Sequence, residues 1–512
     1  MYIAMGNESF SIDFFYKILF EGKKISITPE ALAKVQKSYD FLHDFSQGKL
    51  IYGITTGFGP MAQHRISDAD RIELQYNLIR SHSSGVGNHI DPLYVKAGMI
   101  CRLAAILQAK SGVHPECVLL LQEFINNDII PVIFEHGGVG ASGDLVQLSH
   151  LALSLIGEGE VYFNGAVVPT AQAMQACNLK PISIHIREGL SLINGTSIMT
   201  GVGIVNILRA KNLYNWSLMA SAIINELVDS YDDGFSHELN SVKLHDGQNE
   251  VAAAMRSILK GSSLIKKRHV HLYNRTVTEK VVKEKVQEYY SLRCVPQVLG
   301  PILDTLTYAE RVLINEANSV NDNPIVDMDT HNVYHGGNFH GDYISLEMDK
   351  LKIVVTKLTM LIERQLNFLM NPALNEKFPP FVNLGVLGLN LGMQGVQFTA
   401  TSTTAECQTL SFPNYVHSIP NNNDNQDIVS MGTNSALITR KVIENSYEVL
   451  AIYYISLLQA VDYIAVHEKM ARRTHHVYVQ LRELVPAFIK DTPKYKDVAR
   501  VKDFLMKTTI TI

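Results

Sequence analysis

The chain has 512 residues, of which 46% are hydrophobic, and its formal net charge is −5 at pH 7. This length exceeds a single typical hydrophobic core, so we expect more than one packed lobe. The mild negative charge excludes the strongly basic surface that binding to nucleic acid or to an anionic membrane requires. We therefore expect neither a nucleic-acid partner nor a membrane partner.

Cysteine usage is typical of a reducing compartment. The five cysteines are scattered along the chain and form no Cys-x-x-Cys pair, which argues against a disulfide framework and against a cysteine zinc site. The N-terminal residues show no basic region followed by an apolar core, so we expect no signal peptide. These features together predict a cytoplasmic protein.

The first two hundred residues are predicted to form a lobe of short elements. We expect short helices over residues 1–50, followed by a loop with three glycines from Tyr52 to Pro60. Ser67 and Asp70 are spaced as in a capping box, with Asp in place of the usual Glu, and predict the start of a helix that ends near His82. A further helix is predicted over residues 93–110.

After residue 200 the pattern changes to long helical runs with few breakers. They cover residues 199–228, 302–319, 343–370 and 437–466. In the third run, leucines and valines recur at helical spacing. A helix of about 30 residues is about 45 Å long and needs partners of similar length. We therefore predict a central helical bundle shared between subunits, and we expect the polar stretch 385–410 to be helical as well.

A glycine-rich loop, Gly137 to Leu145, lies between the apolar run Ile129–Phe134 and a helical run, Leu145–Ile156. Its glycines satisfy G-x-G-x-x-G, and this spacing is typical of a loop that binds a dinucleotide such as NAD. That interpretation requires strands that alternate with helices. The long helical runs after residue 200 do not favour it.

The same loop contains Ala141-Ser142-Gly143, a tripeptide that can cyclise through its own backbone. The amide nitrogen of Gly143 attacks the carbonyl carbon of Ala141, and Ser142 loses its hydroxyl as water. The product is a methylidene-imidazolone (MIO), which carries an electron-poor alkene. Glycine offers the least hindered amide and the backbone freedom for a compressed turn. Asp144 is predicted to cap the following helix, whose dipole would then favour negative charge on the MIO.

Seven segments, taken together and in order, resemble the aromatic amino acid ammonia-lyase family. They are Tyr52–Gly59, Gly137–Leu145, Ile193–Thr196, Tyr290–Cys294, Asn321–Pro324, Gly336–His340 and Asn425–Asp427. The resemblance implies a mainly α fold of the ammonia-lyase/fumarase-like type, with a long central bundle and a smaller N-terminal lobe that carries the MIO loop. We expect the lobes at residues 1–200, 201–470 and 471–512.

The resemblance also implies an enzyme with a self-made MIO and with neither NAD nor a metal. Its partner would be a small-molecule amino acid, and the chain would form a homotetramer with sites at subunit junctions. An oxidoreductase that uses a nucleotide, or a helical scaffold without catalysis, remains open from the residues alone. Both of these alternatives require an intact Ser142, whereas MIO formation removes two water molecules from residues 137–145.

Catalytic roles follow from the positions that match the family's motifs. Tyr52 matches the base that removes the substrate's β-hydrogen, and because a phenol has a reference pKa near 10, activity should favour alkaline pH. Arg293 matches the residue that grips the substrate carboxylate, for which a bidentate guanidinium is well suited. Asn194 and Tyr290 match residues that hold the MIO or the substrate by hydrogen bonds.

The remaining assignments concern the substrate side of the site. Phe339 is expected to pack against the substrate or the MIO ring, and Gln287 and Asn338 are expected at the edge of the site. Ser81 and His82 fall where the family recognises the substrate side chain, and this pair resembles the histidine lyases.

Gln426 stands where the histidine lyases carry a glutamate that contacts the imidazole. Losing that carboxylate removes a charge-assisted hydrogen bond worth about 1.5–3 kcal/mol, whereas His82 can bond a phenol hydroxyl. The chain as a whole resembles bacterial tyrosine ammonia-lyases, so we expect L-tyrosine to be converted to the phenylpropanoid trans-p-coumarate and ammonia. Two alternatives remain open: conversion of L-histidine to urocanate, and an MIO-dependent tyrosine 2,3-aminomutase.

Overall fold

The computed structural model describes residues 2–6, 9–274 and 276–512. Over these residues the chain is mainly helical, with only short strands in small sheets, which confirms the predicted fold class. The chain divides into two compact units. The first unit contains residues 1–208, 309–349 and 413–440, and the second contains 209–308, 350–412 and 441–512. The three sequential lobes expected from the sequence remain a prediction.

The first unit carries most of the short elements. Its helices are α1 (Ile12–Leu19), α2 (Pro29–Phe45), α3 (Arg71–His82), α4 (Pro92–Leu107), α5 (Pro115–Asn126), α6 (Leu145–Leu155), α7 (Thr170–Ala176), α8 (Glu188–Ile193) and the 3-10 helix η1 (Gly59–Met61). Its strands are β1 (Tyr2–Met5), β2 (Lys24–Ile27), β3 (Val86–His89), β4 (Ile130–Pro131), β5 (Phe134–His136), β6 (Glu160–Phe163), β7 (Ala166–Pro169), β8 (Ile325–Asp327) and β9 (Asn332–Tyr334). The expectation of short helices alone over residues 1–50 was therefore incomplete, because β1 and β2 pair there in parallel.

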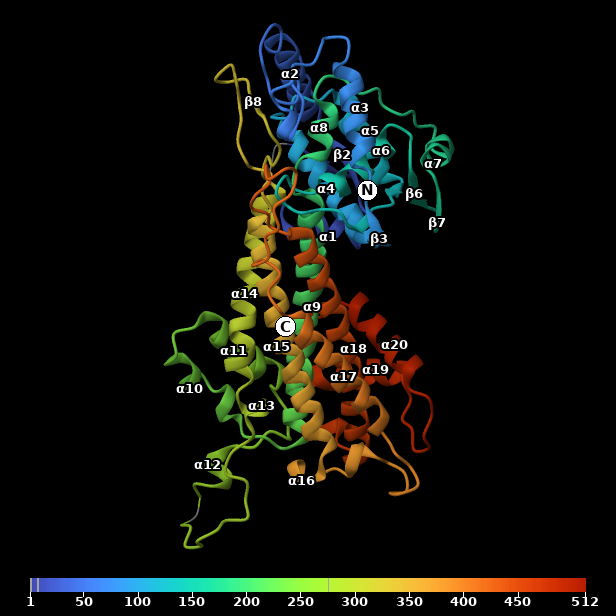
Figure 1. Ribbon diagram of the computed structural model, residues 1–512. Helices are drawn as coiled ribbons and strands as arrows, with labels where there is room; N and C mark the ends of the chain where they lie inside the picture. The colour runs from blue at the N-terminus through green and yellow to red at the C-terminus, as the bar shows by residue number, and fades with distance from the viewer. Residues whose placement is uncertain (1, 7–8, 275) are drawn as a thin grey trace. The chain divides into compact units, whose positions relative to one another are not determined.

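Helix packing forms the core of the first unit. Helix α4 is buried along almost its whole length and packs against α5, while α3, α6 and α8 contact one another (Figure 1). Helix α3 begins at Arg71 after Asp70, whose side chain makes no capping bond. The Ser67 hydroxyl instead donates to the Asp70 carboxylate at 2.6 Å. The predicted capping box is thus wrong in its bonding, although the predicted end at His82 is confirmed.

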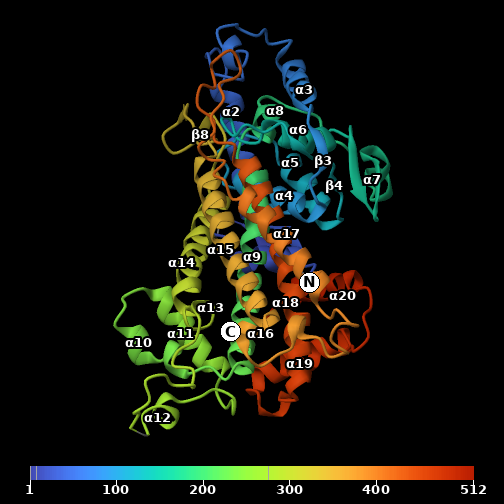
Figure 2. The same cartoon turned by 60° about the horizontal axis from the view of Figure 1, so that its bottom comes forward.

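Four long helices belong in part to each unit: α9 (Ser197–Leu227), α14 (Val295–Ala317), α15 (Asp342–Met370) and α18 (Gly432–Ile464). Within the first unit, the Asn206 amide of α9 donates to the Ala436 carbonyl of α18 at 2.8 Å. Within the second unit, the Tyr454 hydroxyl of α18 donates to the Trp216 carbonyl of α9 at 2.7 Å. The long helices predicted from periodicity are confirmed, and Figure 2 draws them side by side.

The second unit adds shorter elements to these long helices. They are α10 (His237–Ser241), α11 (Asp246–Ile258), α12 (Arg268–His271), α13 (Tyr290–Arg293), α16 (Pro372–Asn375), α17 (Gln394–Leu410), α19 (Arg472–Leu484), α20 (Tyr495–Lys507) and the 3-10 helices η2 (Asp232–Phe235), η3 (Pro380–Val382) and η4 (His467–Lys469). The expected helix over 385–410 begins only at Gln394, because residues 385–393 form turns with Gly388 and Gly392 at positive φ. Among the described residues, no helix is both long enough and apolar enough to cross a membrane.

Candidate active site

The Ala141-Ser142-Gly143 loop leads from β5 into α6 and is pressed against the segment Asn194–Gly195. Gly143 pairs with Gly195 in a parallel bridge, and the Asp144 amide donates to the Gly195 carbonyl at 2.7 Å. Gly143 has a φ of +72°, and a Cβ there would lie 2.0 Å from the Gly195 oxygen. Only glycine satisfies both the backbone conformation and this close approach.

The Asp144 side chain caps a different helix from the one predicted. Its Oδ2 accepts hydrogen bonds from the backbone amides of Ile198 at 2.8 Å and Met199 at 2.9 Å, in the first turn of α9. It makes no capping bond to α6. Oδ1 accepts a bond from the Thr433 hydroxyl. Complete burial raises the pKa of Asp144 to about 6, although these three hydrogen bonds oppose the shift. The carboxylate therefore fixes the loop to the N-terminus of the long helix α9.

The start of the loop is held from the opposite side. The Gly140 carbonyl accepts hydrogen bonds from the Ser430 hydroxyl and from the Gly341 amide, both at 3.0 Å. The Met431 amide donates to the Val139 carbonyl at 2.9 Å. Because partners hold the backbone on both sides of Ala141, the tripeptide cannot relax into an open turn without breaking several hydrogen bonds.

A buried arginine supports the segment that faces the loop. The Arg102 guanidinium of α4 is fully buried and donates to the Asn194 carbonyl at 2.9 Å and to the Ser191 carbonyl. Burial lowers the pKa of Arg102 to about 10, so the group stays charged at neutral pH. The charge fixes Asn194, whose side-chain amide donates to the Ser142 carbonyl at 3.0 Å.

Ser142 opens into a cavity of about 590 Å³ in the first unit. The cavity is lined by many of the residues that the sequence assigned to the site: Tyr52, Ser81, His82, Ser142, Asn194, Phe339 and Gln426. Ala141 and Gly143 flank Ser142 and are buried. Residues from distant parts of the chain therefore meet around one serine.

Hydrogen bonds orient the imidazole of His82 at this cavity. Its Nδ1 lies 2.9 Å from the Leu78 carbonyl oxygen and 3.0 Å from the Ser81 hydroxyl. A carbonyl oxygen can only accept, so Nδ1 carries the hydrogen in the neutral ring and Nε2 is left as an acceptor. His82 can therefore receive a hydrogen bond from a ligand.

Two further polar groups lie around Ser142. The Gln426 amide donates to the Ser142 hydroxyl at 3.0 Å. The Tyr52 hydroxyl oxygen accepts a hydrogen bond from the Gly59 amide at 3.0 Å, and the Tyr52 ring makes an edge contact with Phe58. His335 also lines the cavity, and burial lowers the pKa of its imidazole.

Three predicted site residues belong to the second unit and lie together there. The Arg293 guanidinium lies over the Tyr290 ring, 4.8 Å from its centroid, and donates to the Gln287 side chain. Every residue that lines the cavity around Ser142 belongs to the first unit. Asn338 also lies in the first unit, but it is exposed, donates to the Val320 carbonyl at 3.4 Å and does not line the cavity.

Sequence reasoning missed most of the apolar lining. The cavity is also lined by the apolar residues Phe58, Met61, Leu74, Leu78 and Leu190 and by the polar residues Asn323, Asn422 and Asn425. Phe58, Asn323 and Asn425 lie in segments that matched the family. Their positions in these motifs could therefore have predicted that they line the cavity. Leu74, Leu78 and Leu190 lie on helices, and nothing in a helical pattern separates a leucine that lines a cavity from one that fills a core.

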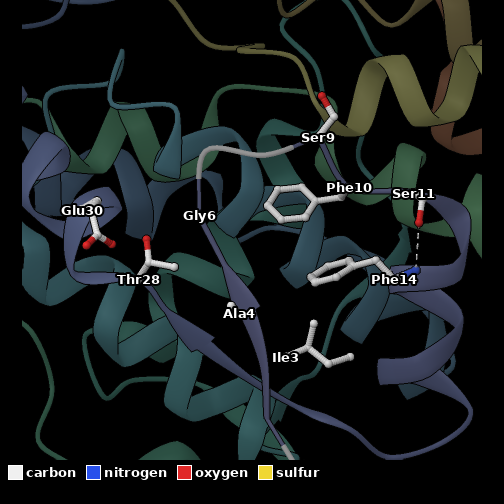
Figure 3. Close-up of a pocket in the computed structure, with 9 residues that line it drawn as sticks. All are labelled: Ile3, Ala4, Gly6, Ser9, Phe10, Ser11, Phe14, Thr28 and Glu30. Atoms are coloured by element: carbon white, nitrogen blue, oxygen red, sulfur yellow. Dashed lines mark hydrogen bonds between the residues drawn. The ribbon is translucent and has the colours of Figure 1, made fainter.

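A second hollow, of about 530 Å³, lies near the first strands of the chain. Figure 3 shows the Phe10 and Phe14 rings on one side of it and Thr28 and Glu30 on another. The two rings lie 4.7 Å apart, centroid to centroid. None of the residues that the sequence assigned to the site lines this hollow, so the chemistry is expected in the cavity around Ser142.

Comparison with known proteins agrees with this arrangement. The family model described as aromatic amino acid lyase matches residues 10–483. The chain is 38% identical over 463 residues to a tyrosine 2,3-aminomutase of Myxococcus sp. (strain Mx-B0), covering 89% of this chain and 88% of the relative. It is 37% identical over 504 residues to a histidine ammonia-lyase of Shouchella clausii (strain KSM-K16), covering 98% of each.

A solved structure gives the same result. The crystal structure of the tyrosine aminomutase from Streptomyces globisporus matches with a TM-score of 0.94 at 35% identity, covering 99% of this chain and 97% of that one. The chain therefore belongs to the aromatic amino acid lyase family. It is an enzyme of the carbon–nitrogen lyase class, in a family whose members in general depend on MIO. The family predicted from seven short motifs is confirmed.

Proposed function

We propose that this enzyme removes ammonia from L-tyrosine to give trans-p-coumarate. The observation that carries the proposal is the orientation of His82, whose Nε2 is an acceptor in the same cavity as Ser142. A substrate phenol would donate its hydroxyl hydrogen to that nitrogen. Phenylalanine would leave the nitrogen unpaired, and a buried unpaired polar group costs about 1–3 kcal/mol.

We infer that Ala141, Ser142 and Gly143 form the MIO, and the contacts of the loop fit this group. Gly143 already approaches Gly195 too closely for any side chain, and hydrogen bonds restrain the backbone on both sides of the tripeptide. The MIO supplies an electron-poor alkene that turns the substrate amine into a better leaving group. Asn194 donates to the Ser142 carbonyl oxygen, the atom that takes up negative charge when the alkene accepts electrons.

The other residues take the roles expected from the family's motifs. Tyr52 removes the β-hydrogen, and the bond from the Gly59 amide fixes the position of its oxygen. Arg293 binds the substrate carboxylate, Tyr290 holds the MIO or the substrate by a hydrogen bond, and Gln287 lies at the edge of the site. Tyr290 and Gln287 both contact the Arg293 guanidinium, so they can also orient it. Phe339 packs against the substrate ring. Neither NAD nor a metal takes part in this chemistry.

A second candidate, a tyrosine 2,3-aminomutase, is favoured by the relative at 38% identity that bears that name. An aminomutase re-adds ammonia at the β-carbon of the same substrate, so it would use the same groups. Histidine ammonia-lyase is a further candidate because another relative bears that name. The neutral Gln426, which donates to the Ser142 hydroxyl, offers no carboxylate to an imidazole and makes histidine the weaker candidate.

We also propose that the chain forms a homotetramer with its sites at subunit junctions, as the family resemblance implies. Tyr290, Arg293 and Gln287 would then be supplied to a cavity around Ser142 at such a junction. A cytoplasmic location stays a prediction that rests on the scattered, unpaired cysteines.

The deciding experiment measures initial rates on L-tyrosine, L-histidine and L-phenylalanine side by side at mildly alkaline pH, with Ser142→Ala as the control. Formation of p-coumarate as the fastest reaction, absent in the control, supports the proposal. Chromatography of the tyrosine reaction for β-tyrosine separates a lyase from an aminomutase. Faster conversion of histidine would contradict the substrate assignment but not the MIO chemistry.

A further inference from the structure

Three donor side chains gather in the first unit away from the cavity around Ser142. His114, Glu116 and His185 bring one ligand atom each to within 4.8 Å of one another. The two imidazole rings lie 4.8 Å apart, centroid to centroid, and His114 Nδ1 lies 3.7 Å from a Glu116 carboxylate oxygen. None of the three residues lines the cavity around Ser142.

A buried carboxylate holds the two histidines in place. One oxygen of Glu188 accepts a hydrogen bond from the His114 backbone amide, and the other accepts one from the His185 backbone amide, both at 2.6 Å. Glu188 is fully buried at the start of α8. The edge of the Tyr39 ring contacts both imidazoles, with centroids 5.1 Å and 5.8 Å away. The backbones of His114 and His185 are therefore held close to each other before any ligand binds.

We propose that His114, Glu116 and His185 form a binding site for a divalent cation of the zinc type. Two imidazoles and one carboxylate are donors that suit Zn²⁺, with water in the fourth position. Bond lengths of about 2.0–2.2 Å put the donors of a tetrahedral site roughly 3.4 Å apart. Rotation can bring the Glu116 carboxylate closer to the imidazoles, because its side chain is 61% exposed.

Neighbouring groups leave this donor set intact. The His114 Nδ1 accepts a hydrogen bond from the Glu116 amide at 3.4 Å, which is long for such a bond, so exchanging it for a metal bond loses little.

The proposed cation site lies between the segment before α8 and the start of α5. His185 lies just before α8, the helix that carries Leu190 and leads to Asn194, and both of these residues line the cavity around Ser142. His114 and Glu116 belong to the start of α5. A cation would tie these two parts of the first unit together, so it stabilises the fold and takes no part in the reaction. The proposal does not depend on which substrate the enzyme uses.

The test uses the full chain after treatment with EDTA and dialysis. Calorimetry measures the titration with ZnCl₂, and visible absorption measures the titration with CoCl₂. Thermal unfolding is measured with and without Zn²⁺. We expect one Zn²⁺ per chain, tetrahedral Co²⁺ absorption and a higher unfolding temperature with metal. Three single variants each remove one ligand: His114→Asn, His185→Gln and Glu116→Gln. The first of them keeps a cap for α5. Each variant should weaken Zn²⁺ binding at least about tenfold.

Controls separate this site from adventitious binding. His476→Gln changes an exposed histidine on α19 and should leave Zn²⁺ binding unchanged. Glu116→Gln alters an exposed side chain, so its loss of binding cannot be blamed on misfolding. The proposal is overturned if all variants bind Zn²⁺ as the unmodified protein does, or if Co²⁺ gives no tetrahedral absorption. Binding only at millimolar metal would also overturn it.

Discussion

At the scale of single residues, two different side chains hold the two oxygens of Ser142. The Asn194 amide donates to its carbonyl oxygen and the Gln426 amide donates to its hydroxyl, each at 3.0 Å. Only the carbonyl oxygen remains after MIO formation, because the hydroxyl is lost as water, so Asn194 is the donor that keeps its partner. Arg102 fixes Asn194 through the Asn194 carbonyl. The serine is therefore held with its carbonyl oxygen facing a fixed donor before any chemistry begins.

The first prediction concerns that donor. Asn194→Ala should lower kcat roughly 10²–10³-fold, because removing one donor from an oxygen that develops negative charge costs about that much. Steady-state kinetics on L-tyrosine measures the effect, and the peptide mass across residues 137–145 establishes that the tripeptide has still lost two water molecules. An unchanged kcat in a protein with the intact MIO mass would rule out this role for Asn194.

The second prediction concerns substrate choice. His82→Leu should lower kcat/KM for L-tyrosine by roughly tenfold to a hundredfold and raise it for L-phenylalanine, because the variant loses the acceptor for the phenol hydroxyl. Ser83→Ala is the matched control, since its hydroxyl bonds Ile79 in the same turn but the residue does not line the cavity. A variant that keeps its preference for tyrosine would show that another group recognises the phenol.

At the scale of secondary-structure elements, the end of α3 is positioned by a histidine on another helix. His150 of α6 accepts a hydrogen bond from the Gly85 amide through Nε2, at 3.1 Å. Gly85 follows directly on the turn that carries Ser81 and His82. Burial lowers the pKa of His150, so the folded protein favours the neutral ring, which alone can accept this bond.

The third prediction is a pH dependence of stability. Above about pH 6.5 His150 is neutral in both the folded and the unfolded chain, so it contributes no dependence there. As the pH falls below that value the unfolded chain takes up the proton first, and the free energy of unfolding decreases. His150→Gln keeps an acceptor but does not titrate, so its unfolding temperature should fall less than that of the unmodified protein between about pH 7 and pH 5.5. Equal decreases in both proteins would contradict this.

Helix prediction from the sequence succeeded where the hydrophobic periodicity was strong. It was less accurate at the start of one helix, and it missed a short hairpin. The run predicted over 343–370 is α15, Asp342–Met370. The run predicted from residue 302 begins earlier, at Val295, and the helix α14 contains Pro301 in its interior. The hairpin of β6 and β7 was missed. Its turn is Asn164-Gly165, and both residues have a positive φ. An Asn-Gly turn is a strong hairpin signal.

The candidate site was predictable only in part, for a physical reason. Tyr52, His82 and Ser142 were assigned because they lie at positions that match the family's motifs, and each of them alone would have been a weak signal. Arg102 did not stand out, because an arginine on a helix is usually exposed. Its burial follows from how distant segments meet, and one sequence does not contain that information in readable form.

At the scale of the whole molecule, the residues proposed to act in the site are divided between the two units. Tyr52, Ser142 and Asn194 belong to the first unit, whereas Tyr290 and Arg293 belong to the second. If the active enzyme is a tetramer with sites at subunit junctions, we expect Tyr52 and Arg293 of one site to come from different chains. Two inactive variants should then complement each other in mixed tetramers. One chain would supply an intact Tyr52 and its neighbour an intact Arg293 to the same site.

The last prediction tests this directly. Tyr52→Phe and Arg293→Ala should each abolish most activity alone. Co-expression of the two variants should restore activity toward about a quarter of the unmodified level, because random pairing joins an intact Tyr52 to an intact Arg293 in roughly one site of four. Co-expression of Tyr52→Phe with Ser142→Ala is the control. It should restore no activity, because Tyr52 and Ser142 line one cavity of one chain and every site would lack one of them. Native mass spectrometry establishes that the mixed tetramers form. Mixed tetramers without restored activity would mean that each chain supplies its own Arg293 to its own Tyr52.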